Sequence, residues 1–357
     1  MKKEIRVCIV GVGNCSSSLH QGIGYYKNKK NKSGLIFNKI GSYSVSDINI
    51  VSAFDINQNK IGKKFSNAIF EKPNNAKKFF TKHKNNTIVK PGPILDGLTG
   101  RTRKIINEHG IKKTYAEWMN FVVSELKLQR VDVLVSYLPV GSKKASIFYA
   151  RCALKAKVAY ANAIPEFICS SKLFSNLFLK AGVPCAGDDV KSQIGATIIH
   201  RVLVDIINKR GFTIDNTFQL NIGGNLDFLN MLDESRLISK RISKTEAVTK
   251  NASNQSFDTK IGPSDYVSFL NDNKICFIEI NGKQFGGVPF KLELKLSVED
   301  SPNSAGVMVD VIRLLKICLD KNLKGYQDFS SFYFKHPQKN MNDNEAYRKV
   351  SQIASSN

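Results

Sequence analysis

The chain has 357 residues, of which 42% are hydrophobic and 10% aromatic, so it can bury the core of one large or two linked globular domains. No apolar run approaches the roughly 18–20 residues that cross a membrane, and the N-terminus enters a strand pattern instead of a signal peptide, so we expect a cytoplasmic protein without a membrane partner. The formal net charge of +23 comes largely from lysines mixed with asparagines, as in residues 27–32 and 77–86, and no nucleic-acid-binding signature accompanies it, so no specific nucleic acid is expected.

The cysteines do not suggest a covalent framework. There are seven, an odd number, none forms a C-x-x-C pair, and most lie inside apolar stretches. Reduced thiols in such positions pack as small hydrophobic groups. We therefore expect neither disulfides nor a zinc site.

A glycine turn follows the first predicted strand, Ile5–Val10. Gly11-Val12-Gly13 comes directly after this apolar run, and a helix-compatible stretch follows. Such a turn lets the backbone approach a pyrophosphate, which then lies at the N-terminus of the helix. Ser16 replaces the usual third glycine, so the pattern alone leaves open a dinucleotide site or a purely structural turn.

A second predicted strand, Ile48–Asp55, ends in an acidic residue. In dinucleotide-binding folds an acid at this point holds the ribose hydroxyls, which makes Asp55 the candidate. It lies further from the glycines than the usual distance of about 20 residues, and the polar stretch Lys27–Ser46 accounts for the excess as a loop insertion. The alternative is that Asp55 caps the following helix.

Strands and helices alternate through the rest of the first half. Strands are predicted at residues 131–136, 158–162 and 183–186, with a helix over Lys143–Lys155. This alternation predicts an α/β fold with a Rossmann-type, doubly wound parallel sheet. Polar residues at the strand ends would face the cofactor crevice: Ser136, Asn162, Asp188 and Asp189.

From about Phe218 the predicted strands become longer, and residues 291–298 alternate between polar and apolar side chains. That alternation is typical of a sheet with one wet or interfacial face. We expect a second α/β domain, then a helix over Ala305–Cys318 and a C-terminal segment that returns to the first domain. The predicted domains are 1–195, completed by 300–357, and 196–299.

Residues Gly187–Thr197 end a strand in charged and hydroxyl-bearing residues, just before a predicted helix over Ile198–Arg210. Ser192, Gln193 and Thr197 supply hydroxyl or amide groups, and the helix N-terminus supplies free N–H donors. This arrangement suits a phosphate monoester. The alternative is that Ser192 only caps the helix.

Lys240 and Lys244 are four residues apart, so on a helix they share one face. Two ammonium groups placed in this way each tend to lower the pKa of the other, and such lysines can act as acids or bases. Pairs of this kind are more often solvated, so the meaning of this one depends on the surrounding motifs.

Eight strings are distinctive in order and spacing: residues 11–18, 136–142, 162–165 and 187–197 in the first half, and 221–231, 239–245, 261–265 and 299–306 in the second. Together they resemble the inositol-1-phosphate synthases, in particular the shorter bacterial and archaeal branch. The resemblance covers roughly residues 4–337 and is closest in the second half.

This resemblance implies the isomerase activity of inositol-3-phosphate synthases, which convert D-glucose 6-phosphate into 1D-myo-inositol 3-phosphate in inositol and phospholipid biosynthesis. It implies oxidation at C5 with NAD, enolisation at C6, intramolecular aldol cyclisation onto C1 and return of the hydride, without net redox change. It further implies an NAD-binding first domain, a catalytic and oligomerisation domain over 196–299, a homotetramer, and a monovalent or divalent cation.

The resemblance also assigns roles to individual residues. Lys240 would transfer a proton at the C5 oxygen, and Lys274 would stabilise the enolate or aldehyde oxygen. Lys244 would bind the phosphate, and Lys335 the sugar oxygens. The other predicted substrate contacts are Ser192, Gln193 and Gly195 to the phosphate, and Asn221, Asn225 and Asp227 to the hydroxyls. The predicted cofactor contacts are Gly11, Gly13, Asn14, Ser16, Asp55, Ser136, Tyr137, Asn162, Asp188, Asp189, Arg201 and Asp300.

Two other functions are compatible with the sequence. A sugar-phosphate or amino-acid-pathway dehydrogenase with a Rossmann half would release NADH in each turnover, so free NADH separates it from a synthase. A non-catalytic NAD-sensing or nucleic-acid-binding protein that has kept only the fold would bind its ligand without isomerase activity.

Overall fold

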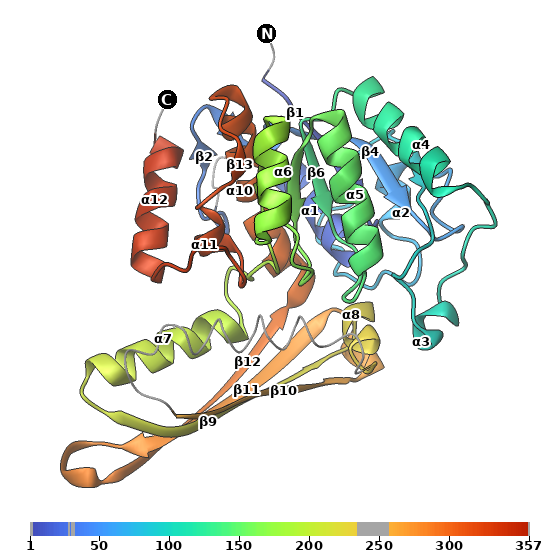
Figure 1. Ribbon diagram of the computed structural model, residues 1–357. Coiled ribbons are helices and arrows are strands. Elements are labelled where there is room, and N and C mark those ends of the chain that lie inside the picture. The colour runs from blue at the N-terminus through green and yellow to red at the C-terminus, as the bar shows by residue number, and fades with distance from the viewer. Residues whose placement is uncertain (1–2, 28, 30–32, 234–256, 356–357) are drawn as a thin grey trace.

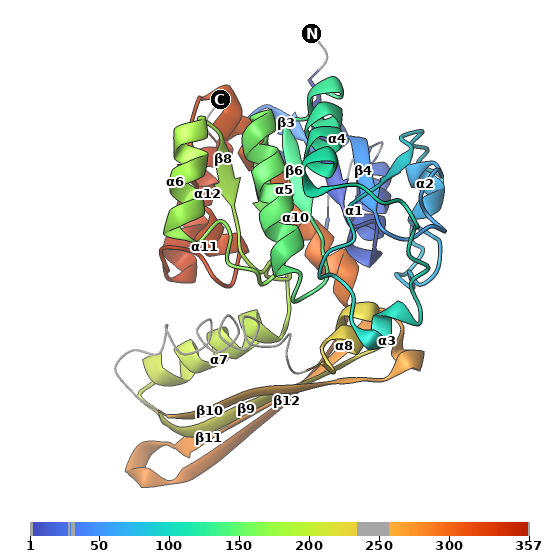
Figure 2. The same cartoon turned by 45° about the vertical axis from the view of Figure 1, so that its right-hand side comes forward.

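The computed structural model of the chain describes residues 3–27, 29, 33–233 and 257–355. A larger unit is built around a seven-stranded sheet, and in a smaller unit a four-stranded sheet is covered on one face by helix α7 (Ala196–Lys209) (Figure 1). Helix α7 lies on the face of the smaller sheet that is turned toward the larger unit (Figures 1 and 2). None of the helices in the described ranges is long and apolar enough to cross a membrane.

The larger sheet has the strand order β13-β8-β7-β6-β1-β4-β5, and every pairing in it is parallel. From β1 the chain runs outward to β4 and β5 and then crosses back to β6 on the other side. This is the predicted Rossmann-type, doubly wound arrangement, which is therefore confirmed. The strands are β1 (Ile5–Val10), β4 (Ile48–Asp55), β5 (Val89–Pro91), β6 (Val133–Ser136), β7 (Ala159–Asn162), β8 (Pro184–Ala186) and β13 (Gly325–Tyr326).

Alternate residues of β1 pack into two hydrophobic cores, one on each face of the larger sheet. Ile5, Val7 and Ile9 belong to the first core, and Cys8 and Val10 to the second. Because both faces are covered, the strands of this sheet read as continuous apolar runs and not as alternating ones. The helices on the two faces are α1 (Asn14–Tyr26) and α10 (Asp300–Asp320) in the first core, and α4 (Tyr115–Leu128), α5 (Lys143–Ala156) and α6 (Lys172–Ala181) in the second.

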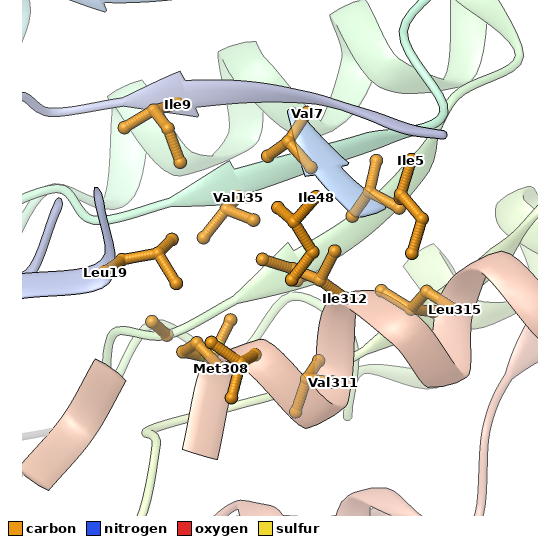
Figure 3. Packing of buried hydrophobic residues seen from close by; sticks show 14 of the residues in the cluster. Ile5, Val7, Ile9, Leu19, Ile48, Val135, Met308, Val311, Ile312 and Leu315 are labelled. Atoms are coloured by element: carbon orange, nitrogen blue, oxygen red, sulfur yellow. The ribbon is translucent and has the colours of Figure 1, made fainter. Parts of the chain in front are cut away.

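Helix α10 brings the C-terminal part of the chain back onto the first half. Figure 3 shows Met308, Ile312 and Leu315 of this helix beneath the strands, and all three are fully buried. Each such side chain contributes about 1.5–3 kcal/mol on burial. The helix begins at Asp300, five residues earlier than predicted. Pro302 is compatible with this start, because it lies in the first turn, where a missing N–H costs no hydrogen bond.

The predicted loop insertion Lys27–Ser46 is only partly a loop. It contains a two-stranded antiparallel sheet formed by β2 (Lys39–Ile40) and β3 (Tyr43–Ser44). Arg313 of α10 contacts this segment. Its fully buried guanidinium also pairs with the buried carboxylate of Asp310. The guanidinium donates hydrogen bonds to three carbonyl oxygens of the insertion, those of Phe37, Asn38 and Tyr43.

The smaller sheet has the order β10-β9-β11-β12, in which β9 and β10 are parallel and the other pairs antiparallel. Its core lies under α7 and includes Ile207, Ile214 and Ile278. On β12, exposed and half-buried residues alternate, in agreement with the sequence pattern. The strands are β9 (Thr213–Gly223), β10 (Asp258–Tyr266), β11 (Asn273–Lys283) and β12 (Pro289–Glu299).

The C-terminal segment packs on the larger unit. After α10, strand β13 pairs with β8 at the edge of the larger sheet, and helix α12 contacts β2 of the insertion. All seven cysteines are free thiols, and six of them are buried. The remaining short elements are η1 (Val45–Asp47), α2 (Phe65–Ala68), α3 (Gly100–Arg103), α8 (Leu226–Asn230), η3 (Ser268–Leu270), η4 (Phe285–Gly287), α11 (Ser330–Tyr333) and α12 (Asp343–Ser355).

Candidate active site

The turn between β1 and α1 requires glycine at one position and leaves open space at another. Gly11 has a φ of +91°, and a Cβ there would lie 2.6 Å from the carbonyl oxygen of Tyr137. Gly13 is the N-cap of α1, and a Cβ at this position would meet no atom of the described residues within 4 Å. Ser16, in place of the third glycine, donates its hydroxyl to the Gly13 carbonyl at 2.8 Å. The helix has no acidic residue in its first turn, so its free N–H groups suit a phosphate.

Asp55 lies at the end of β4, directly beside this turn. Its carboxylate accepts hydrogen bonds from the backbone N–H groups of Val12 and Asn57, both at 2.8 Å. The buried ammonium of Lys60 lies 3.9 Å from the same carboxylate and donates to the Val12 carbonyl at 2.7 Å. Burial lowers the pKa of Lys60, and Asp55 opposes this shift. Asp55 therefore also holds the glycine turn in place.

Asp272 connects the glycine turn to the smaller unit, and sequence reasoning missed it. Its buried carboxylate accepts hydrogen bonds from Nδ2 of Asn14 at 3.0 Å and from Nδ2 of Asn225 at 3.2 Å. It also accepts from the hydroxyl of Ser301 at 2.8 Å and from its N–H at 3.1 Å. Burial, followed by the neighbouring Asp300, raises the pKa of Asp272 to about 6. The start of α1, α8 and α10 thus meet at one carboxylate.

Asp188, at the end of β8, faces protein groups and not open space. Its fully buried carboxylate accepts hydrogen bonds from Nδ2 of Asn162 at 2.8 Å and from the N–H of Cys169 at 3.1 Å. The N–H and hydroxyl of Ser170 donate to it as well, at 2.9 and 2.8 Å. Burial raises the pKa of Asp188 to about 6. In this structure the carboxylate of Asp188 positions Asn162 and the adjoining loop, and the cofactor contact predicted for Asp188 stays a prediction.

Ser136 and Tyr137, at the end of β6, lie against the glycine turn. The N–H of Tyr137 donates to the Val10 carbonyl at 2.8 Å, and its own carbonyl is the group that a Cβ on Gly11 would meet. Ser136 is fully buried. The buried hydroxyl of Tyr137 has no hydrogen-bond partner in the part of the chain that the structure describes. A polar atom left over at this place favours a ligand beside the turn.

One pocket gathers much of the predicted phosphate and sugar site. It opens where the loop after β8 and the start of α7 meet strands β9 and β11. Gly195 is the N-cap of α7, and among the described residues no side chain caps this helix, so Ser192 does not act as the cap and the first N–H groups of the helix face the pocket loop without a side-chain acceptor from this part of the chain. The lining residues are Ser192, Gly195, Ala196, Thr197, Ile198, Gln219, Asn221, Lys274 and Lys335.

Lys274 enters this pocket from the start of β11. Its ammonium lies 3.2 Å from Oδ1 of Asp300 and 5.7 Å from the centre of the Phe228 ring. Burial by itself lowers the pKa of Lys274, but Asp300 and then Asp227 act more strongly together, and the net shift is upward. The group is therefore a fixed positive charge at neutral pH.

Lys335 enters the same pocket from the C-terminal segment. Its ammonium lies 2.8 Å from Oδ1 of Asp189, and its N–H donates to the Asp189 carbonyl, also at 2.8 Å. Both contacts fix the lysine relative to the end of β8. Lys240 and Lys244, the other two predicted catalytic lysines, lie outside the described residues.

Three further predicted contact residues, Gln193, Arg201 and Asn225, bind other protein groups with their side chains. The side-chain amide of Gln193 donates to the Gly34 carbonyl at 2.8 Å, which turns it toward the insertion. Arg201 is buried in an ion pair with Asp343 of α12 at 3.1 Å, so its charge already has a protein partner. Asn225 caps α8 and binds Asp272, which leaves it a structural role at this junction. Within the described ranges, no group of three or more His, Cys, Asp or Glu side chains is placed to hold a metal ion.

The doubly wound sheet, the glycine turn and the adjoining pocket with its two lysines define a Rossmann-type α/β protein with a second unit. The family model described as myo-inositol-1-phosphate synthase matches residues 195–301. An inositol-3-phosphate synthase of Mycolicibacterium smegmatis is 47% identical over 360 residues, which are 96% of each chain. One from Mycobacterium tuberculosis is 46% identical over 364 residues, covering 98% of this chain and 95% of its own. The chain therefore belongs to the inositol-3-phosphate synthase family, and the predicted bacterial branch is confirmed.

A solved structure agrees with this assignment. The crystal structure of a myo-inositol-1-phosphate synthase-related protein from Thermotoga maritima MSB8 superposes with a TM-score of 0.84. It is 26% identical in sequence, and the alignment covers 99% of both chains. Both units of the fold, and not only the Rossmann part, are thus shared with this relative.

Proposed function

We propose that this chain converts D-glucose 6-phosphate into 1D-myo-inositol 3-phosphate, with NAD as a recycled cofactor. Its full-length relatives carry the name of that activity. The observation that carries the proposal is the meeting of two lysines, Lys274 and Lys335, with the free N-terminus of α7 in one pocket. Asp272 ties this pocket to the glycine turn, because it binds Asn14 and lies two residues before Lys274.

The glycine turn fits a dinucleotide. The open space at Gly13 and the free N–H groups of α1 suit the pyrophosphate, and Asp55 stands where the ribose hydroxyls are expected. The unpartnered hydroxyl of Tyr137 and the Asp300 carboxylate are the proposed neighbours of the nicotinamide end. When bound, NAD supplies a hydride acceptor that is later a donor, so a carbonyl at C5 makes the C6 proton acidic.

The predicted substrate-site and catalytic residues have separate proposed roles. The N-terminus of α7, with Ser192 and Thr197, binds the phosphate, and Lys244 adds a positive charge. Lys274 stands opposite the oxygen on which negative charge develops during cyclisation, where a fixed ammonium lowers the barrier. Lys335 binds the sugar oxygens, and Lys240 moves the proton at the C5 oxygen.

The two units divide the work in this proposal. Residues 1–195 and 300–357 bind NAD, and residues 196–299 supply catalytic groups and the contacts of a homotetramer in the cytoplasm. Large apolar side chains on the smaller unit support an interface: Phe269 is 81% exposed and Phe285 97%. Sedimentation equilibrium at micromolar concentration should give four times the mass of the chain, and a monomer would contradict this part.

A single incubation tests the proposed activity. The purified protein is incubated with glucose 6-phosphate and NAD, inositol phosphate is followed by ³¹P NMR, and NADH by its absorbance. The proposal requires inositol phosphate without accumulation of NADH, because the hydride returns to the intermediate. Stoichiometric NADH would instead identify a dehydrogenase, and an inert mixture across several added cations would leave only a binding role.

Gly11→Ala should mainly lower stability, whereas Gly13→Ala should mainly weaken NAD binding. Gly11→Ala places a Cβ against the Tyr137 carbonyl at positive φ, so we expect a loss of about 1–3 kcal/mol in the free energy of unfolding. Gly13→Ala meets open space, so stability should change by less than about 1 kcal/mol. The new methyl group would nevertheless enter the pyrophosphate space, so NAD should bind at least tenfold more weakly. Urea unfolding measures the stability of both variants, and calorimetry measures their affinity for NAD. Full NAD affinity in Gly13→Ala would contradict the proposed position of the pyrophosphate.

A further inference from the structure

A chain of buried polar side chains runs behind the pocket. Thr217, Gln219 and Asn221 occupy alternate positions of β9, so they share the face that α7 covers, and all three are buried. His200 of α7 is fully buried between them: its Nε2 lies 2.8 Å from the Thr217 hydroxyl, and its Nδ1 lies 3.3 Å from the Gln219 amide. The Gln219 amide in turn lies 3.2 Å from that of Asn221. Since Gln219 and Asn221 both line the pocket, this chain ends at the substrate site.

The Thr217 end of the chain fixes its direction. The hydroxyl of Thr217 lies 2.6 Å from the Glu279 carbonyl oxygen, which can only accept, so the single hydroxyl proton lies between these two atoms. The Thr217 oxygen is then an acceptor for His200, which must carry its proton on Nε2. Burial lowers the pKa of His200 to about 4, so the imidazole is neutral and its Nδ1 is a bare acceptor.

A bare Nδ1 requires an N–H from Gln219. If the amide oxygen of Gln219 faces Nδ1 of His200, two hydrogen-bond acceptors face each other with no proton between them. In the same arrangement Nδ2 of Asn221, a donor, has no partner within the described residues. A half-turn of both amides removes the conflict, because Gln219 then donates to Nδ1 and accepts from Asn221. After this half-turn, the side-chain atom of Asn221 that has no hydrogen-bond partner within the described residues is its carbonyl oxygen.

We propose that His200 is a positioning residue that acts through Gln219 to make Asn221 present a carbonyl oxygen, and not N–H groups, to the pocket. A carbonyl oxygen accepts the proton of a sugar hydroxyl and repels the oxygens of a phosphate. It therefore orients the substrate with its phosphate at the N-terminus of α7 and its hydroxyls at β9. The choice of glucose 6-phosphate as that substrate rests on the proposed function.

The position of the imidazole proton can be measured on the resting protein. The chain has only five histidines, so the imidazole region of the ¹⁵N NMR spectrum of labelled protein at pH 7 contains few signals. The signal that disappears in His200→Asn belongs to His200. We expect a proton on Nε2 and none on Nδ1. A proton on Nδ1, or one on each nitrogen, would overturn the proposal. This measurement needs no substrate, so it stands even if the protein has no synthase activity.

Ligand binding tests the consequence at Asn221. In His200→Leu, glucose 6-phosphate should bind about tenfold more weakly, the effect of one lost hydrogen bond, whereas inorganic phosphate should bind as before. His200→Asn should recover most of the loss, because its carbonyl oxygen can take the acceptor place of Nδ1. Equal losses for both ligands, or no loss for either, would overturn the proposal. If His200→Leu does not fold, the NMR result on the natural chain decides, and failure of that chain to bind glucose 6-phosphate would count against the proposed function alone.

Discussion

Lys274→Ala is expected to lower kcat for the conversion of glucose 6-phosphate by about 100- to 1000-fold, the usual effect of removing one group that stabilises a developing oxyanion. Lys274 is suited to this role because its ammonium is held 3.2 Å from Asp300 and kept charged, while it lines the pocket. NAD affinity should change little, because the glycine turn is untouched. The measurements are kcat from inositol phosphate formation and the NAD Kd from calorimetry.

Lys295 provides a matched control for this substitution. It lies on β12, the strand that pairs with β11, and its ammonium lies 5.6 Å from the centre of the Phe277 ring, much as Lys274 lies over Phe228. It does not line the pocket. Lys295→Ala should therefore keep normal turnover. The role given to Lys274 would be wrong if its alanine variant retained more than about a tenth of the natural kcat, far more than loss of an oxyanion-stabilising group allows.

The sequence predicts the framework of the fold closely where strands are buried on both faces. The limits of β1 and β4 agree with those predicted, because an apolar run bounded by a glycine turn or an acid marks both ends of such a strand. The predictions fail where tertiary contacts decide. The insertion reads as a loop because the groups that hold it are backbone carbonyls bound by Arg313, and these leave no mark on the local sequence.

The residues of the candidate site could also be predicted only in part. The matched strings contain the residues of the pocket loop, and the family resemblance adds Lys274 and Lys335, which lie outside those strings and line the same pocket. Asp272 and His200 were missed because their partners come together only through folding: Asp272 binds a residue 258 positions away. Gln193 lies in a matched string but turns toward Gly34, since a string fixes the position of a residue and not the direction of its side chain.

The second large effect concerns stability, in the buried pair of Arg313 and Asp310. We expect Arg313→Met to lose about 3–5 kcal/mol in the free energy of unfolding, because it leaves a buried carboxylate without its partner and orphans the carbonyls of the insertion. Burial already raises the pKa of Asp310 to about 6 against the opposing effect of Arg313. Without the guanidinium this pKa must rise further, so the folded variant takes up a proton that the unfolded chain, with a pKa of about 3.9, does not hold at neutral pH.

The sign of the pH dependence follows from that difference. A folded-state pKa above the unfolded value makes stability fall as pH rises between the two values, and this holds for the natural chain up to about pH 6 and for Arg313→Met up to its higher pKa. The deficit of Arg313→Met should therefore be constant from about pH 4 to 6 and grow as pH rises above about 6. Lys209→Met, which removes an exposed ion pair with Asp205, should cost less than about 1 kcal/mol and leave the pH profile unchanged. Urea unfolding at several pH values measures both. A deficit in Arg313→Met that does not vary with pH would show that the lost contacts to the insertion carbonyls, and not the charge of Asp310, govern the effect.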